Sequence, residues 1–99
     1  MPTYVTLARL NQEGVKSLKD WRSNYDELKR IAETIGVNIT AAYTLLGPYD
    51  MLFIIEADDE KDLMRQSLLF SVKGATVETW TAVPAEEFSE VTDSVRAFL

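Results

Sequence analysis

The chain has 99 residues, of which 46% are hydrophobic and 26% are charged, and this composition is that of one ordinary globular domain. Its 16 acidic and 10 basic residues give a formal net charge of −6, which disfavours nucleic acids and anionic membrane surfaces as partners, because both attract basic patches. Cysteine and histidine are absent, which excludes disulfides, Ser-His-Asp or Cys-His catalysis, and zinc or haem held by those residues. We therefore expect no cofactor and no transition-metal site, and only a hard cation on carboxylates stays open.

The hydropathy of the chain bears on its location. Residues 1–10 contain no basic stretch and no long apolar core, so the sequence predicts no signal peptide. The longest apolar run, residues 51–55, is too short to cross a bilayer. We expect a cytoplasmic protein.

The first half of the chain predicts a strand, a long helix and a second strand. Residues 3–9 alternate and are rich in β-branched and aromatic types, which is typical of a strand. Asn11 is a suitable N-cap for a helix over residues 12–35, and Gly36 is a suitable stop. The apolar stripe of that helix consists of Leu18, Trp21, Tyr25, Leu28, Ala32 and Ile35. Residues 38–46 predict the second strand, with Ile39, Ala41, Tyr43 and Leu45 on one face.

A tight turn and a third strand follow. Gly47, Pro48, Tyr49 and Asp50 have the composition of a turn between adjacent antiparallel strands. Residues 51–56 predict a strand that is apolar on both faces until Glu56. Such a strand needs cover above and below, which the chain is too small to provide alone.

The last part of the chain predicts a helix, a strand and a terminal helix. Asp58 or Asp59 begins a helix that reaches about residue 72, and residues 75–83 form the fourth strand. Pro84 then opens a final helix. Its apolar stripe consists of Phe88, Val91, Val95 and Phe98.

The order of these elements, β-α-β-β-α-β with a terminal helix, is that of an α+β ferredoxin-like domain with a four-stranded antiparallel sheet. We expect a single domain over residues 1–99. Its two helices cover one face of the sheet and leave the other face open. The large side chains expected on that open face are Tyr4, Tyr43, Phe53 and Trp80, accompanied by Thr6 and Glu78. Because this set is too apolar to face water, we expect a homodimer or a higher assembly.

Five segments carry a family resemblance. The Gly-x-Tyr-Asp turn at residues 47–50 is followed by the apolar strand and by the acidic run EADDE at residues 56–60. The segments TYVTL at residues 3–7 and VETWTA at residues 77–82 complete the pattern. In this order and spacing the chain resembles the GYD domain family of small bacterial and archaeal proteins, with Pro48 in a variable place of the motif. The resemblance spans roughly residues 3–88.

The GYD family is similar to the dimeric α/β-barrel proteins, in which two ferredoxin-like sheets pack face to face and enclose a cavity. That group includes cofactor-free monooxygenases, lactone isomerases, haem enzymes and domains without known activity. The resemblance therefore implies a dimeric α/β-barrel assembly and leaves the activity open.

The open face supplies the first candidate site. Any ligand is expected to contact Tyr4, Tyr43 and Trp80, with Glu78 as the nearest acid or base. The alternative is that these rings pack against a second subunit, because aromatic side chains on a sheet face serve interfaces as well as cavities.

The turn is the second candidate site. Gly47 and Pro48 set a tight turn, and Asp50 is expected to accept hydrogen bonds from nearby backbone amides. The functional alternative is that Tyr49 and Asp50 border the mouth of a pocket, because loops at strand ends often carry function.

Three functions remain open. The first is a homo-oligomeric barrel that binds a small apolar or aromatic molecule between its sheets. The second is a cofactor-free monooxygenase or isomerase-like enzyme that uses Tyr or Glu, which the absence of histidine disfavours. The third is a purely structural interaction protein whose side chains fill the cavity. The expected partners are a second copy of the chain and a small molecule, with no nucleic acid and no membrane.

Overall fold

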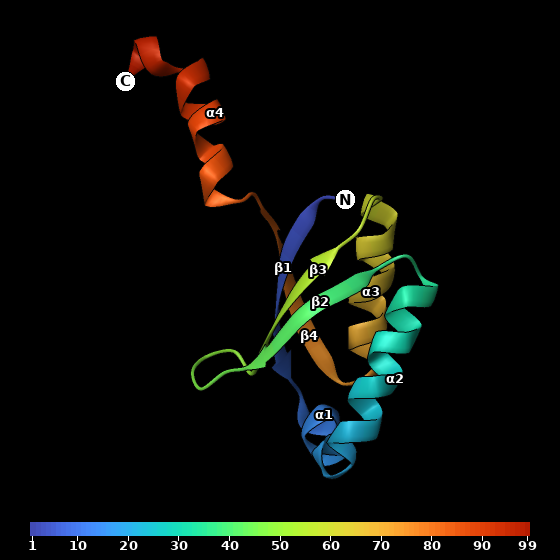
Figure 1. Ribbon diagram of the computed structural model, residues 1–99. Helices are drawn as coiled ribbons and strands as arrows, with labels where there is room; N and C mark the ends of the chain where they lie inside the picture. The colour runs from blue at the N-terminus through green and yellow to red at the C-terminus, as the bar shows by residue number, and fades with distance from the viewer.

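The computed structural model describes all 99 residues, Met1–Leu99, and confirms the ferredoxin-like α+β fold. Four strands form one antiparallel sheet: β1 (Thr3–Leu10), β2 (Asn38–Thr44), β3 (Met51–Glu56) and β4 (Ala75–Ala82). Their order across the sheet is β2-β3-β1-β4 (Figure 1), so β1 and β3 are central. The two central strands therefore decide what each face of the sheet presents.

Two long helices, α2 (Trp21–Thr34) and α3 (Glu60–Val72), lie on the same face of the sheet (Figure 1). Asp59 caps α3 as predicted, since its Oδ1 accepts a hydrogen bond from the Lys61 backbone N–H at 2.9 Å. The predicted stop at Gly36 is also confirmed: Gly36 has a φ of 90°, and Gly74, which follows α3, has a φ of 91°, a conformation that glycine adopts without steric cost.

The single helix expected over residues 12–35 is wrong, because the segment is divided into α1 (Gln12–Lys16), the 3-10 turn η1 (Ser17–Asp20) and α2. Asn11 caps α1 as predicted, with its Oδ1 3.0 Å from the Gly14 backbone N. The Asn11 backbone N–H also donates to the Gly74 carbonyl at 2.9 Å. This bond ties α1 to the turn before β4 while α2 follows the sheet, so the chain changes direction between them.

The hydrophobic core lies between the sheet and the two helices. Met51, Phe53 and Ile55 of β3 are buried there, with Phe53 and Ile55 fully shielded from solvent. Phe53 meets Phe70 of α3 edge to face, with ring centroids 5.0 Å apart. Leu28 is buried on α2, which confirms the central part of the predicted apolar stripe.

The expected placement of Tyr4, Thr6 and Phe53 on the open face is wrong. Tyr4 pairs with Ile55, and Thr6 pairs with Phe53, and paired residues of antiparallel strands share a face. All of them lie on the helix side, where Tyr4 packs against the core. Thr6 is buried there because its hydroxyl has two partners, Gln66 Nε2 and Thr79 Oγ1, each at 3.0 Å.

An irregularity in β2 places residues that were expected on one face on different sides of the sheet. These residues are Ile39, Ala41, Tyr43 and Leu45. Ile39 pairs with Ile55, whereas Ala41 pairs with Ile54, so the register shifts between them. A bulge of this kind reverses the side to which later residues point. Ile39 consequently packs against the core, while Ala41 and Tyr43 lie on the open face and Leu45 falls beyond the strand.

The C-terminal arm, residues 84–99, stands away from the sheet and its helices (Figure 1). It contains η2 (Ala85–Glu87), α4 (Phe88–Ser94) and η3 (Arg96–Phe98) in place of one helix. Pro84 precedes the first turn as predicted. All four members of its apolar stripe are exposed, and Phe98 is 89% exposed. No helix of the chain has both the length and the apolar character that crossing a membrane requires.

Candidate functional site

The open face is the side of the sheet that carries no helix, and six apolar or aromatic side chains lie on it: Val5, Leu7, Tyr43, Leu52, Ile54 and Trp80. The pairings place Val5 between Ile54 and Trp80, so one apolar row crosses three strands. A second row runs from Leu7 through Leu52 to Tyr43. Trp80 is 61% and Tyr43 is 57% exposed. Soluble monomers rarely leave such a contiguous apolar surface in water.

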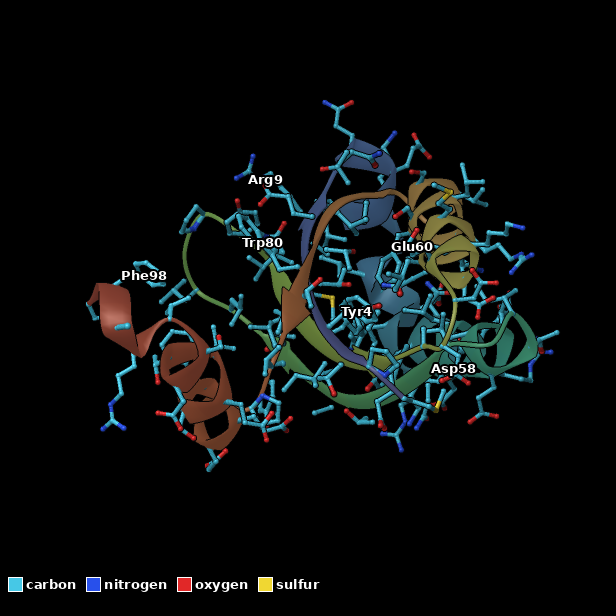
Figure 2. The ribbon with its side chains drawn as sticks, turned by 90° about the horizontal axis from the view of Figure 1, so that it is seen from above. Tyr4, Arg9, Asp58, Glu60, Trp80 and Phe98 are labelled. Atoms are coloured by element: carbon cyan, nitrogen blue, oxygen red, sulfur yellow. The ribbon has the colours of Figure 1, made fainter.

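Figure 2 shows Trp80 and Arg9 on the side of the sheet away from the helices, and Tyr4 on the side toward them. Of the four residues predicted to contact a ligand, the structure thus brings Tyr43, Glu78 and Trp80 to one face. Tyr4 is separated from them by the thickness of the sheet.

A polar cluster of Arg9, Tyr49 and Glu78 lies at one end of the open face. The Tyr49 hydroxyl donates a hydrogen bond to Glu78 Oε1 at 2.8 Å. The Arg9 guanidinium lies over the Tyr49 ring, 5.0 Å from its centroid, and Arg9 Nε donates to the Pro48 carbonyl at 2.9 Å. The bond to the Glu78 carboxylate raises the pKa of Tyr49, because it favours the protonated phenol.

Asp50 fastens the turn to the sheet. Its Oδ2 accepts a hydrogen bond from the Leu10 backbone N–H at 2.7 Å, and its own backbone N–H donates to the Ala8 carbonyl at 2.9 Å. The predicted bond from Asp50 to a backbone amide is confirmed, although the amide belongs to β1 and not to the turn. Asp50 therefore fixes the loop in which Tyr49 reaches Glu78.

A hollow of about 250 Å³ lies beside the polar cluster and is lined by Leu7, Arg9, Tyr49, Thr76, Val77 and Glu78. Tyr49 thus borders a pocket, while Asp50 does not line it. Arg9 was not predicted as a site residue. No sequence signal links it to Tyr49, because the two meet only through the pairing of β1 with its neighbours. No group of three or more carboxylates is arranged to share a metal ion.

A ferredoxin-like domain with an uncovered apolar sheet face and a Gly-x-Tyr-Asp turn defines the class of protein. The family model of the GYD domain matches residues 4–92, so the chain belongs to the GYD domain family and the predicted resemblance is confirmed. A relative from Thermus thermophilus is 31% identical over 93 residues, which cover 88% of this chain and 94% of the relative. That protein is described as a glutamine synthetase and cystathionine beta-lyase binding protein.

Proposed function

We propose that the chain is a protein-binding module that assembles with copies of itself through the open face. The observation that carries the proposal is the pair of apolar rows on that face, with Trp80 61% exposed in the single chain. A second subunit packed against these rows would remove them from water, and such burial stabilises by roughly 25 cal/mol per Å² of apolar surface. The exposed stripe of the C-terminal arm offers further apolar surface to the same assembly.

The partners of the module are proposed from its relative. The Thermus thermophilus protein is described as binding glutamine synthetase and cystathionine beta-lyase. We propose that this chain likewise binds one or both of these enzymes. The net charge of −6 supports a protein partner over a nucleic acid.

The test measures, by biolayer interferometry, the binding of the purified chain to each of the two enzymes, immobilised and taken from the organism that encodes the chain. We expect saturable binding to at least one of the two enzymes and none to an unrelated acidic protein. Trp80→Asp should weaken the binding, because a module that no longer assembles loses multivalent contact. Val15→Asp, at an exposed position of α1, is the control and should bind like the wild type. Absence of saturable binding to both enzymes would refute the proposed partners.

A second candidate function is small-molecule binding on the open face, and the polar cluster of Arg9, Tyr49 and Glu78 favours it. The hollow combines the apolar side chains of Leu7 and Val77 with these convergent polar groups, and small-molecule sites use both kinds of contact. Native mass spectrometry of the purified chain should then report a retained small molecule. Trp80→Ala should reduce that retention more than Asp50→Ala, because Trp80 lies on the open face next to Glu78, whereas the Asp50 carboxylate is bound to the Leu10 backbone. The reverse ranking would move the site to the turn.

A further inference from the structure

A cavity of about 310 Å³ lies on the other side of the sheet, between α2 and α3. Helix α2 packs over β2 and helix α3 beside β4, which leaves the central strands β1 and β3 beneath the gap. Ala8, Met51 and Phe53 of these strands form the floor. The small side chain of Ala8 leaves part of this space unfilled.

The walls of the cavity are apolar and largely aromatic. Trp21 and Tyr25 line one wall and stack with ring centroids 5.4 Å apart and planes 13° from parallel. Leu28 continues that wall, and Phe70 of α3 stands opposite. The volume lies at the lower end of the range of about 300–1,000 Å³ for small-molecule sites. The space therefore suits a flat or branched apolar group of metabolite size.

The mouth of the cavity carries one positive and one negative side chain, Lys73 and Glu13. Gly14 and Gly74, the residues that follow them, touch: a Cβ on Gly14 would lie 2.3 Å from the Gly74 carbonyl oxygen. This contact brings Glu13 and Lys73 to the same rim, although 60 positions separate them in the sequence.

Both rim charges are available to a ligand. Lys73 Nζ donates to Glu27 Oε1 at 2.9 Å, which holds the ammonium at the gap between the helices and leaves two further N–H donors. The same contact holds the pKa of Glu27 below its usual value. Glu13 has only an exposed pairing with Lys16 at 3.8 Å, which is too weak to occupy its carboxylate.

We propose that this cavity binds a free α-amino acid with a branched or aromatic apolar side chain. The side chain enters between the Trp21–Tyr25 stack and Phe70. The carboxylate of the ligand binds Lys73, and its ammonium group binds Glu13. A ligand carboxylate gives Lys73 a second anionic partner beside Glu27, and a ligand ammonium group gives Glu13 a partner closer than Lys16, so a zwitterion makes both contacts where a simple acid or amine makes one. This site is independent of the open face and of the protein partners proposed above.

Trp21 supplies the readout. The chain has two tryptophans, so Trp80→Phe leaves Trp21 as the single indole fluorophore. In this variant, titration with L-leucine and with L-phenylalanine should give a saturable change in tryptophan emission. 3-Phenylpropionate lacks the ammonium group and phenethylamine lacks the carboxylate. Each should bind at least about tenfold more weakly than L-phenylalanine, a loss of about 1.4 kcal/mol.

Matched variants locate the site. Ala8→Leu fills the floor and should abolish the saturable change, while Ala41→Leu makes the same substitution on the open face and should preserve it. Lys73→Met should weaken the binding of L-phenylalanine but not that of phenethylamine, which has no carboxylate to contact Lys73. Should Ala8→Leu fail to fold by circular dichroism, Leu28→Phe fills the same cavity from the α2 wall. A flat titration with both amino acids, or an unchanged titration in the filling variant, would overturn the proposal.

Discussion

Tyr49 and Glu78 lie 29 residues apart in the sequence and meet at 2.8 Å on the open face. This contact raises the pKa of the Tyr49 phenol above its ordinary value of 10.0. Because the folded state favours the protonated phenol, the Tyr49–Glu78 hydrogen bond stabilises the fold, and this contribution is fully present below the ordinary tyrosine pKa. It is lost as the pH rises through the raised pKa of the folded state.

We therefore predict that one of the four tyrosines titrates later than an exposed tyrosine when tyrosinate absorbance is followed at alkaline pH. Glu78→Gln should lower the pKa of that tyrosine toward its ordinary value, because the negative charge beside the phenolate is removed. Tyr49→Phe should eliminate the late step altogether, which assigns it. A late step that persists in Tyr49→Phe would contradict the contact.

Asp50 holds the turn against β1, and the contribution of this contact to stability can be measured. Its carboxylate accepts a hydrogen bond from the Leu10 backbone N–H at 2.7 Å. Asp50→Ala removes this acceptor and should lower the free energy of unfolding by about 1–3 kcal/mol. Asp50→Asn keeps an acceptor oxygen and should lose about half as much, since a neutral acceptor bonds more weakly. Urea denaturation measures both variants. Equal losses in the two variants would show that the hydrogen bond does not depend on the charge.

At the scale of elements, the contact between Gly14 and Gly74 holds α1 against the turn before β4. Alanine has a higher helix propensity than glycine by about 1 kcal/mol, so Gly14→Ala in an isolated helix would stabilise. Here the added methyl would meet the Gly74 backbone, and we predict a loss of about 1–3 kcal/mol. Val15→Ala, at the next and exposed position, should change stability by less than about 0.5 kcal/mol. Thermal unfolding followed by circular dichroism compares them, and a stabilised Gly14→Ala would contradict the close contact.

The elements themselves were predictable because their signals are local. Asn11 and Asp59 each cap a helix through a residue only two or three positions away, and Gly36 and Gly74 end helices through their own backbone angles. Strand boundaries followed from alternation and from the turn at Pro48. The division of the first helix was not predicted, since one apolar stripe runs through residues 18–35 and the bond from Asn11 to the turn before β4 joins segments that are distant in the sequence.

The faces of the strands were harder to predict than the strands. β3 is apolar on both sides, so its sequence does not say whether Phe53 or Leu52 meets the helices. Thr6 was expected on the open face because it lies on the same side of its strand as Tyr4, but Gln66 and Thr79 satisfy its hydroxyl within the core. A bulge in β2 then reversed the side of Tyr43 relative to Ile39. Each error comes from pairing between distant segments, which periodicity along one strand does not contain.

At the scale of the whole molecule, Phe53 and Trp80 distinguish folding from assembly. Phe53 is fully buried against Phe70, so Phe53→Asp places an unpaired charge in the core and should cost more than about 4 kcal/mol, enough to unfold the chain. Trp80→Asp changes an exposed position of the open face and should leave the monomer folded. Far-UV circular dichroism separates the two outcomes, and an unfolded Trp80→Asp would mean that the open face contributes to the core.

The central claim is that the open face joins copies of the chain, and light scattering coupled to size-exclusion chromatography tests it most directly. At micromolar concentration the wild type should have the mass of a dimer or of a larger assembly, because its apolar rows are then covered. Trp80→Asp should have the mass of the monomer with an unchanged circular dichroism spectrum, while the control Val15→Asp should keep the wild-type mass. A monomeric wild type, or a Trp80→Asp variant that retains the full assembly mass, would contradict the claim.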